Sequence, residues 1–260
     1  MTTLNSRIFS ISKLLFVMTM VSALSACGKS KPTLEEVQKL AAAGDVSAQY
    51  DLGTRYQDSV GVPKDMVKAA EWIEKAAAQG HLQAQKDIGW IYAKGDGIPA
   101  NPTKAMEWYQ KAAAQGDAWA EYRVGEMYNK GLGINKDIDQ ARIWLEKAAI
   151  KGRADAQYAV GMIYLMDEDF YEAREYLEKA AAQSHPDAQY HLASMFASGK
   201  GLKKNPNYPL MAYAWAQVAA KQGYKGADKL RDSIHLSPPQ RAEAEQWASN
   251  WKHGQLLPAP

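Results

Sequence analysis

The chain has 260 residues, of which 47% are hydrophobic and 23% are charged, the balance of a globular protein. Its 31 Lys and Arg residues nearly match its 29 Asp and Glu residues, and the small excess comes from Arg7 and Lys13 in a leading segment without acids. The rest of the chain is neutral, which excludes the broad positive field that attracts nucleic acid. The single cysteine excludes an internal disulfide and a zinc site built on several cysteines.

The first 27 residues predict an export signal with a lipid attachment site. Arg7 and Lys13 form a positive region, and the uncharged run from Leu14 to Ala26 is shorter than the about 20 apolar residues that span a bilayer. Leu24-Ser25-Ala26-Cys27 resembles the lipobox of bacterial lipoproteins, which implies removal of residues 1–26 and acylation of Cys27. The alternative is an ordinary signal peptide with a cysteine there by chance.

Residues 27–32 are then a lipidated N-terminus with a short linker, which keeps the folded body near the membrane. Two or more acyl chains anchor a protein durably, whereas one chain does so only marginally. The resemblance to Gram-negative lipoproteins, with Gly28 rather than Asp after the cysteine, favours the outer membrane. We therefore expect a lipid-anchored protein of the bacterial cell envelope, on the inner leaflet of the outer membrane and facing the periplasm.

A repeat of 36 residues follows a capping box at Thr33 and Glu36, which opens a helix to Ala43. Several columns of residues recur in register, and the fourth and fifth members shift slightly with changes in loop length. One is a small-residue column at Gly53, Gly89, Gly125, Gly161 and Ala193; another is an aromatic column at Trp72, Trp108, Trp144, Tyr176 and Trp215. This register predicts a stack of similar units around one continuous core.

Each unit is predicted to contain two helices, A and B. In the first unit Ala48, Leu52 and Tyr56 share one face of helix A, and Gly53 beside them lets helix B come close. Helix B shows apolar residues at helical spacing around Trp72. Its predicted N-cap residues form a column of small polar side chains: Asp65, Asn101, Asp137 and Asp169.

The residues that carry a family resemblance can now be quoted. Ala48-Gln49-Tyr50-Asp51-Leu52-Gly53, Gly61-Val62-Pro63-Lys64-Asp65 and Ala70-Glu71-Trp72-Ile73-Glu74-Lys75-Ala76-Ala77 together resemble a Sel1-like repeat, and similar copies cover about residues 45–225. The resemblance implies an all-α fold related to tetratricopeptide repeats, a right-handed superhelical solenoid of about five helix–turn–helix units with capping helices. Four local departures affect loops or single positions: Ser59 for a glycine, Glu121 for a glutamine, a shorter loop at Asp167 and an insertion at 205–207.

The C-terminal end predicts a second cap. Ser237 to Gln240 opens a helix that carries Ala244, Trp247, Ala248 and Trp251 along one face. The predicted solenoid therefore spans residues 33–253, and residues 254–260 are predicted to form a flexible tail.

The sequence offers little catalytic chemistry. His191 and Ser194 are three residues apart on a predicted helix, without an acid placed to orient the imidazole. His185, Asp187 and His191 match no established metal-site spacing. His81 and His185 share a column with Asp117 and Arg153, which we interpret as polar turn residues. We expect no enzyme activity, catalytic residue, metal site or cofactor.

The remaining candidate is a binding surface. In tetratricopeptide folds helix A lines the concave side, so the resemblance assigns its exposed columns to a groove. Tyrosine and tryptophan are favoured at recognition surfaces, although the tyrosine column also fits a packing role. The candidate binding residues are Lys86, Trp90, Tyr122, Lys130, Tyr158 and Met162.

Sel1-like proteins generally mediate protein–protein interaction, so the resemblance implies a scaffold or adaptor whose partners are envelope or secretion-system proteins, with no role in nucleic-acid binding. One alternative is a module that binds peptidoglycan or another glycan through its aromatic residues. A second is a β-lactam-interacting hydrolase, because cysteine-rich members of the wider family have been linked to β-lactam binding. This chain lacks the cysteines that brace those members.

Overall fold

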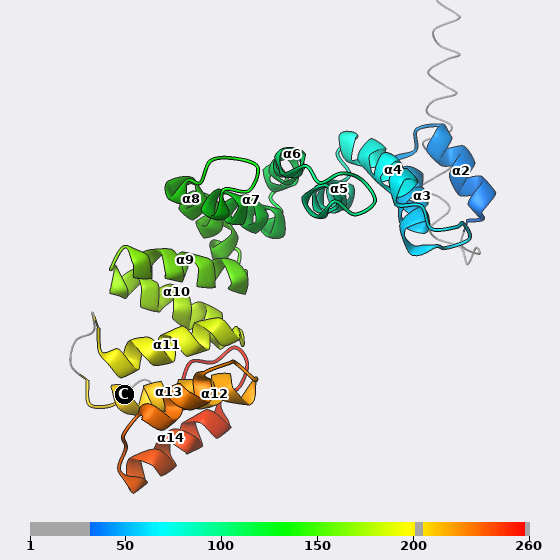
Figure 1. Cartoon of the computed structure of the whole chain (residues 1–260). Helices are drawn as coiled ribbons and strands as arrows, with labels where there is room; N and C mark the ends of the chain where they lie inside the picture. Colours follow the sequence, from blue (N-terminus) through cyan, green and yellow to red (C-terminus); the bar gives the residue numbers. More distant parts are fainter. Residues whose placement is uncertain (1–31, 201–204, 258–260) are drawn as a thin grey trace, which may run out of the picture.

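The computed structural model describes residues 32–200 and 205–257, and over these ranges it consists of helices joined by turns (Figure 1). The predictions for residues 1–26, Cys27 and residues 28–31 lie outside the described residues. Within the described ranges, no helix has both the length and the apolar character that crossing a bilayer requires. The helices are α2 (Leu34–Ala42), α3 (Val46–Asp58), α4 (Met66–Ala78), α5 (Leu82–Lys94), α6 (Pro102–Ala114), α7 (Ala118–Lys130), α8 (Ile138–Ile150), α9 (Ala154–Met166), α10 (Phe170–Ala182), α11 (Pro186–Ser198), α12 (Tyr208–Lys221), α13 (Ala227–Ser233) and α14 (Pro238–Asn250).

The helices form five A/B pairs in a row, which confirms the predicted all-α solenoid. The pairs are α3/α4, α5/α6, α7/α8, α9/α10 and α11/α12, and each B helix also packs on the A helix of the next pair. Figure 1 shows that the row changes direction between α8 and α9. Contacts beyond the next helix in the chain occur near the C-terminal end, where α12 meets α14 and α11 meets α13. Residues of one repeat therefore depend mainly on the two adjacent repeats.

The helices begin where the sequence supplies a hydrogen-bond acceptor. The predicted B-helix column is confirmed: the side chains of Asp65, Asn101, Asp137 and Asp169 each accept a hydrogen bond from a first-turn backbone N–H. The A helices have their own caps, which the sequence analysis interpreted only as turn residues. Asp117 accepts from the N–H of Ala120, and His81 and His185 accept through Nδ1. A first-turn amide would otherwise lack a partner, so these residues fix where their helices start, whereas Arg153 of the same column makes no side-chain cap at α9.

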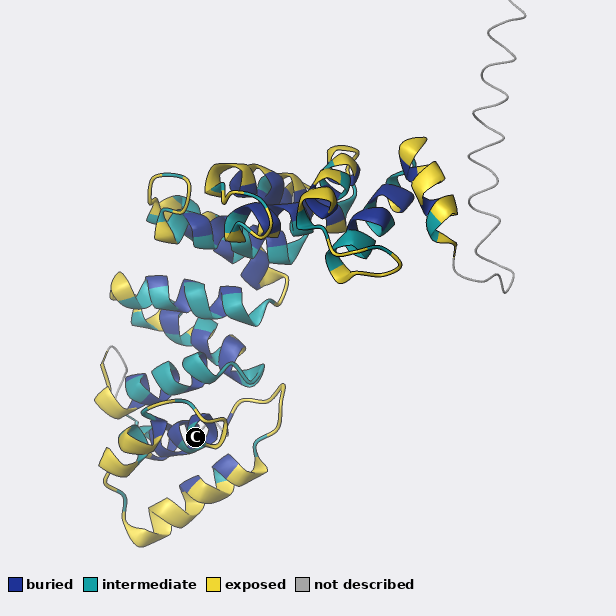
Figure 2. Ribbon diagram, turned by 45° about the vertical axis from the view of Figure 1, so that its right-hand side comes forward, coloured by how far each residue is buried: buried dark blue, intermediate teal, exposed yellow. Residues whose placement is uncertain are grey.

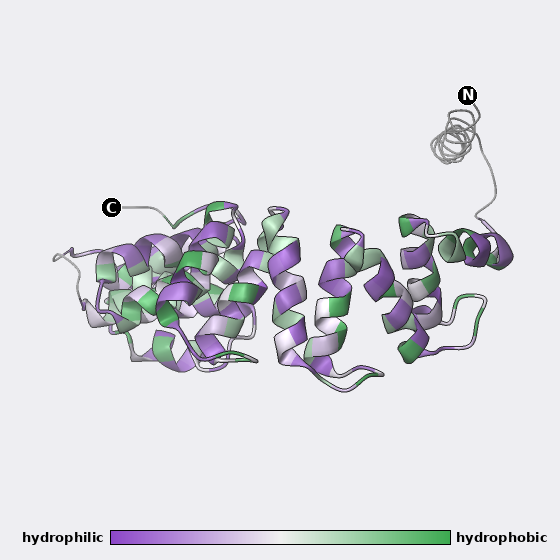
Figure 3. Cartoon of the chain, turned by 90° about the horizontal axis from the view of Figure 1, so that it is seen from above, coloured by the Kyte–Doolittle hydropathy of each residue, from purple (hydrophilic) through white to green (hydrophobic). Residues whose placement is uncertain are grey.

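The small-residue column brings helices A and B into close contact. A Cβ atom built on Gly89 would lie 2.5 Å from Cε1 of Tyr109, which is fully buried on α6. One on Gly125 would lie 2.6 Å from Cγ of Leu145. Figure 2 shows buried residues where the helices face one another and exposed residues on the outer turns, and Figure 3 shows the matching alternation of hydrophobic and hydrophilic residues. The glycines therefore remove side chains where the partner helix occupies the space.

A second column forms a buried polar ladder between repeats. The side-chain amide of Gln85 donates to the carbonyl of Ala77 and accepts from Gln115, which also donates to the carbonyl of Gly80. The same side-chain pair recurs at Gln49/Gln79, Gln157/Gln183 and Gln189/Gln222. Each pair satisfies the hydrogen-bonding groups of buried side-chain amides. Without this pairing the buried amides would lower the stability of the fold.

The third repeat replaces this pair with two charges. Lys151 donates to Oε1 of Glu121 at 2.7 Å and to the carbonyl of Gly116 at 2.9 Å. The departure at Glu121 is therefore matched by a second departure at Lys151. The other carboxylate oxygen of Glu121 is buried without a hydrogen-bond partner in the described part of the chain, because a carboxylate cannot donate as the glutamine amide does.

The loop departures leave the helical pairs intact. Ser59 adopts the left-handed conformation, with φ +61°, that Gly95, Gly131 and Gly199 adopt in the corresponding turns, and its hydroxyl donates to the carbonyl of Val62. The shortened fourth loop leaves residues 167–169 to connect α9 and α10. The insertion at 205–207 leads directly into α12.

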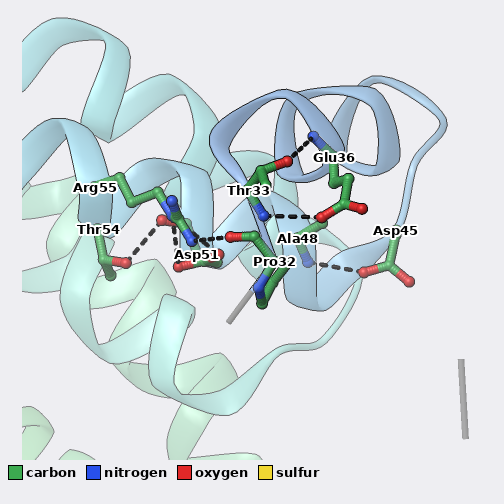
Figure 4. Close-up of polar contacts among 8 residues, drawn as sticks. All are labelled: Pro32, Thr33, Glu36, Asp45, Ala48, Asp51, Thr54 and Arg55. Carbon is green, nitrogen blue, oxygen red and sulfur yellow. Dashed lines mark hydrogen bonds and ion pairs between the residues drawn. The ribbon is translucent and has the colours of Figure 1, made fainter. Parts of the chain in front are cut away.

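The N-terminal cap forms as the sequence predicts. Thr33 and Glu36 exchange hydrogen bonds in a capping box, and Arg55 of α3 donates to the carbonyl of Pro32 (Figure 4). Helix α2 contributes Val37 and Ala41 to the buried core. The first repeat is therefore covered by a short helix.

The C-terminal end differs from the sequence prediction. Helix α13 was not predicted, and the chain after α14 returns to the body rather than leaving it at residue 254. The N–H of Gly254 donates to the carbonyl of Ala182, and Leu257 is only 3% exposed in the core of the last repeats. Burial of Leu257 stabilises this return, so residues 254–257 belong to the folded body and not to a flexible tail.

Candidate functional site

The tyrosine column of the A helices links each repeat to the next. Tyr50 stacks on His81 and Tyr158 stacks on His185, with ring centroids 4.5 and 4.7 Å apart. Tyr190 stacks on Tyr224 in the same way. The positions are equivalent: the fifth residue of an A helix meets the third residue after the end of the B helix that follows it.

The remaining members of this column make polar contacts of the same kind. Lys86 replaces tyrosine in α5 and forms a 3.0 Å ion pair with Asp117, while Tyr122 lies beneath the guanidinium of Arg153 at 5.1 Å. These inter-repeat contacts occupy one face of each tyrosine and most of Lys86. Packing therefore accounts for part of the column.

The structure also has a cleft of about 370 Å³ on the A-helix side of repeats three to five. Helices α7 and α9 form its two walls, and the first turn of α11 closes one end. Side chains of the predicted binding set line it: Tyr122, Lys130, Tyr158 and Met162. We refer to it as the α7–α9 cleft; its further polar lining is Glu126, Asn129, Asp155, His185 and Asp187.

The other two predicted binding residues lie outside this cleft. Lys86, on α5, forms an ion pair with Asp117, the N-cap residue of α7. Trp90 is 43% exposed, and its ring lies 4.9 Å from Nζ of Lys94 and 5.8 Å from the guanidinium of Arg123. The structure therefore brings four of the six predicted residues together and places Trp90 on a separate part of the A-helix face.

The carboxylates of the cleft differ in how their charges are compensated. Glu126 forms ion pairs with Arg123 and Lys130, and Asp155 pairs with Arg153 at 2.6 Å. Asp187 has no ion pair with a lysine or arginine of the described residues; it lies 3.9 Å from Nδ1 of His185, which is a charged partner only when the imidazole is protonated, and its side chain is 47% exposed.

The imidazole beside these carboxylates is shielded from water. Burial lowers the pKa of His185 below its usual value, although Asp187 and Asp155 act in the opposite direction. The same Nδ1 accepts the N–H of Ala188 as the helix cap, so the neutral form is the one that fits the hydrogen bonds. Burial, with Asp187 nearby, raises the pKa of Tyr158 to about 12. At neutral pH the cleft therefore holds a neutral imidazole, a neutral phenol and the charge of Asp187.

The structure shows where the candidate catalytic and metal-ligating residues of the sequence analysis lie. No group of three or more His, Cys, Asp or Glu side chains within the described ranges is placed to hold a metal ion, and this includes His185, Asp187 and His191. The ring of His191 packs against Tyr158 and Tyr190, and burial lowers its pKa. The described structure contains no hydrogen bond between His191 and Ser194.

The residues that the sequence analysis missed at this site are Glu126, Asp155 and the pair His185/Asp187 as binding groups. Asp155 and Asp187 occupy the first turns of successive A helices; the sequence analysis did not single out Asp155, and it considered Asp187 only as a metal ligand with His185 and His191. Their convergence on Tyr158 depends on the rise and rotation from one repeat to the next, which the spacing within one repeat does not specify.

Acidification should destabilise the fourth and fifth repeats. Because the unfolded chain binds protons at His185 and His191 near pH 6.5 and the folded chain only at lower pH, their contribution is complete above that pH and is lost as the pH falls. We expect the melting temperature, followed by far-UV circular dichroism, to fall by a few degrees between pH 7.5 and pH 5.5. His185→Asn, which keeps a capping oxygen, should reduce this dependence, and an unchanged slope would contradict the assignment.

Comparison with known proteins supports the repeat assignment. The sequence model of the family described as Sel1 repeat matches residues 46–81, 82–117, 120–152, 154–185 and 186–224. These segments correspond to the five observed helical pairs. No curated protein matches the chain.

Two solved structures are similar over most of the chain. A Sel1 repeat protein from Oxalobacter formigenes has 29% sequence identity and a TM-score of 0.67, with 84% of this chain and 94% of that chain covered. A protective antigen present in uropathogenic Escherichia coli strains has 27% identity and a TM-score of 0.60, with 84% of this chain covered. This chain spans 55% of the length of the E. coli structure. With five matched units and the observed helical pairs, the chain belongs to the Sel1 repeat family.

Proposed function

We propose that this chain is a lipid-anchored adaptor of the bacterial cell envelope, facing the periplasm, that holds a segment of a partner protein in the α7–α9 cleft. Sel1 repeat proteins generally mediate protein–protein interaction, and solenoids of this family are typically non-catalytic. The observation that carries the proposal is the cleft itself, which is assembled from side chains of three successive repeats on the A-helix side. Mixed aromatic, thioether and charged linings of this kind are typical of recognition surfaces.

The envelope address rests on the sequence of the leading segment. A positive region, an apolar run too short to span a bilayer and a cysteine after Leu24-Ser25-Ala26 together favour export and lipidation at Cys27. Acylation would hold the solenoid near a membrane surface, where a partner meets it at high local concentration.

Cys27→Ser tests the anchor directly. We expect the native chain to incorporate a labelled fatty acid and to sediment with membranes, and the variant to lose both properties, because serine lacks the acylated thiol. Cys27→Ala is the matched control and should behave identically. Continued lipid labelling of either variant would exclude Cys27 as the attachment site.

Photo-crosslinking in intact cells tests the binding cleft. A photoreactive amino acid in place of Met162 lies in the cleft, whereas one in place of Ile150 lies on α8 at a position that is 81% exposed. We expect the photoreactive residue at position 162 to give a discrete crosslinked protein. The residue at position 150 should give no crosslinked product of the same mass. The same products from both positions would remove the cleft as the binding site.

Trp90 offers a test of how far the binding surface extends. Trp90→Ala should leave the crosslink at position 162 unchanged if the partner stays within the cleft, and should weaken it if the partner continues along α5.

Co-sedimentation with purified peptidoglycan tests the glycan-binding alternative. Retention of the native chain on peptidoglycan, together with loss of this retention in Trp90→Ala, would favour that alternative over the adaptor.

A further inference from the structure

We infer that the α7–α9 cleft receives a cationic side chain with an aliphatic stem, an arginine or a lysine, from the bound protein segment. The inference rests on the proposed function, and it names the chemistry of the partner at this site. It follows from the charge of Asp187, the apolar walls around it and the size of the cleft.

The charge argument starts from the ion pairs. Glu126 and Asp155 already have cationic partners from this chain, Arg123 with Lys130 and Arg153 respectively. Asp187 has no ion pair with a lysine or arginine of the described residues, and the imidazole of His185, 3.9 Å away, is neutral at neutral pH. Its carboxylate lies close enough to Tyr158 to raise the pKa of that phenol. A carboxylate charge at the end of the cleft is therefore left without a cation from the described part of the chain.

The walls suit the stem of a long cationic side chain. Tyr122 lies beneath Arg153, and Tyr158 contacts His185 and His191, while both tyrosines also line the cleft. Met162 and Met166 add thioether side chains from the following turns of α9. Methylene groups pack well against rings and thioethers, and a cation gains further from an aromatic face.

The size of the cleft limits what enters it. A volume of about 370 Å³ is near the lower end of the range of about 300–1,000 Å³ for pockets that hold drug-sized ligands. It accommodates one long side chain or two short ones rather than a folded surface. A segment of extended or helical chain that presents one anchor residue fits this limit.

Other occupants fit less well. An acidic side chain would place a second negative charge beside Asp187, which has no ion pair with a lysine or arginine of the described residues, and would be repelled. A purely apolar side chain would cover the carboxylate of Asp187 without supplying a partner, which costs free energy. A cation satisfies Asp187 with a charge-assisted hydrogen bond, and an arginine does so with two parallel bonds.

The test uses the full-length chain in detergent micelles, with ¹³C-labelled methionine methyl groups observed by NMR. The probe is a blocked pentapeptide with one arginine between alanines, and its match carries citrulline, which has nearly the same shape without the charge. Signals of Met162 and Met166 are assigned with Met162→Leu and Met166→Leu. We expect both signals to shift saturably with the arginine peptide and not with the citrulline peptide.

Asp187→Asn should weaken the binding of the arginine peptide by about tenfold, which is the loss of affinity expected for one charge-assisted interaction. Asp228→Asn, at an exposed acid of α13 that pairs with Arg231, is the matched control and should leave the affinity unchanged. The other methionine signals report whether each variant is folded. Equal shifts with citrulline, stronger binding of a glutamate peptide, or no shift at millimolar concentration would each overturn the inference.

These outcomes remain distinct from those of the proposed function. Binding of arginine without any crosslinked protein from position 162 in cells would keep the chemistry of the cleft and remove the adaptor role. A crosslinked protein with no preference for arginine would keep the adaptor and remove the cationic anchor.

Discussion

Lys151→Ala should destabilise the third and fourth repeats by about 3 kcal/mol. Lys151 supplies the positive charge for Glu121, whose side chain is 6% exposed, and its removal leaves a buried carboxylate with neither oxygen paired by a side chain of the described chain. We place the loss at the low end of the range of about 3–5 kcal/mol for broken buried ion pairs, because Lys151 itself is 39% exposed and water can reach the site. Chemical denaturation followed by circular dichroism measures it.

The double variant Glu121→Gln/Lys151→Gln is the control that the chain itself suggests. It recreates the hydrogen-bonded pair of Gln85 and Gln115 and gives the amide of residue 121 a carbonyl to which it can donate. We expect this variant to be at least as stable as the native chain. A loss of stability similar to that of Lys151→Ala would show that the charged pair stabilises the fold more than a pair of glutamines does.

Gly89→Ala should cost about 2 kcal/mol even though alanine is the better helix former. The gain in helix propensity is about 1 kcal/mol, whereas forcing an atom into a packed core costs typically about 1–3 kcal/mol, and the two short contacts at Gly89 place this cost at the upper end. The new Cβ would lie 2.5 and 2.7 Å from two ring carbons of Tyr109. That ring is fully buried and packs edge-on against Trp119, so it cannot move aside easily.

Gly161→Ala is the matched control for Gly89→Ala. Its nearest contact would be 2.9 Å, to Cγ of Leu177, a side chain with more rotational freedom than a tyrosine ring. We expect a loss well below that of Gly89→Ala, with the free energy of unfolding of both variants measured by chemical denaturation. Equal losses would show that backbone properties, and not the facing side chain, decide the outcome.

The fifth repeat shows how the chain accommodates a Cβ at this position. Ala193 occupies the glycine column, and Ala216 occupies the column of Tyr109, Leu145 and Leu177 on the facing helix. A larger residue on α11 is thus accompanied by a smaller one on α12. In a double-mutant cycle, Gly125→Ala and Leu145→Ala should cost less together than the sum of their separate effects.

The sequence predicted most of the fold because one repeat specifies its own helices. The N-cap residues of the B helices and the close contact at Gly89 follow from local propensity and spacing, and the structure confirms both. The return of the chain at Leu257 did not follow from any such pattern. Two leucines in a short segment with Gly254 and prolines look like part of a tail, and only tertiary contact shows that Leu257 is buried while Leu256 is 53% exposed.

The candidate site could be predicted only in part for a related reason. Tyr122, Tyr158 and Met162 occupy repeated columns of helix A, so counting along the repeat places them on one face. His185 and Asp187 belong to the next repeat, and their distance from Tyr158 depends on how two repeats are rotated against each other. The sequence did contain one signal. His81 and His185 occupy the same column of the repeat, and in the structure each of them stacks on a tyrosine.

The unequal ends of the solenoid have a mechanical consequence. The last helical pairs are tied by a segment that reaches back from Gly254 to Ala182, whereas the first repeat is covered by the short α2 with two buried side chains. Under tension the repeats should peel away one after another from the α2 end, while the tied end resists longest. Force applied from that side would thus lengthen the molecule stepwise and leave the α7–α9 cleft formed until the first two repeats had opened.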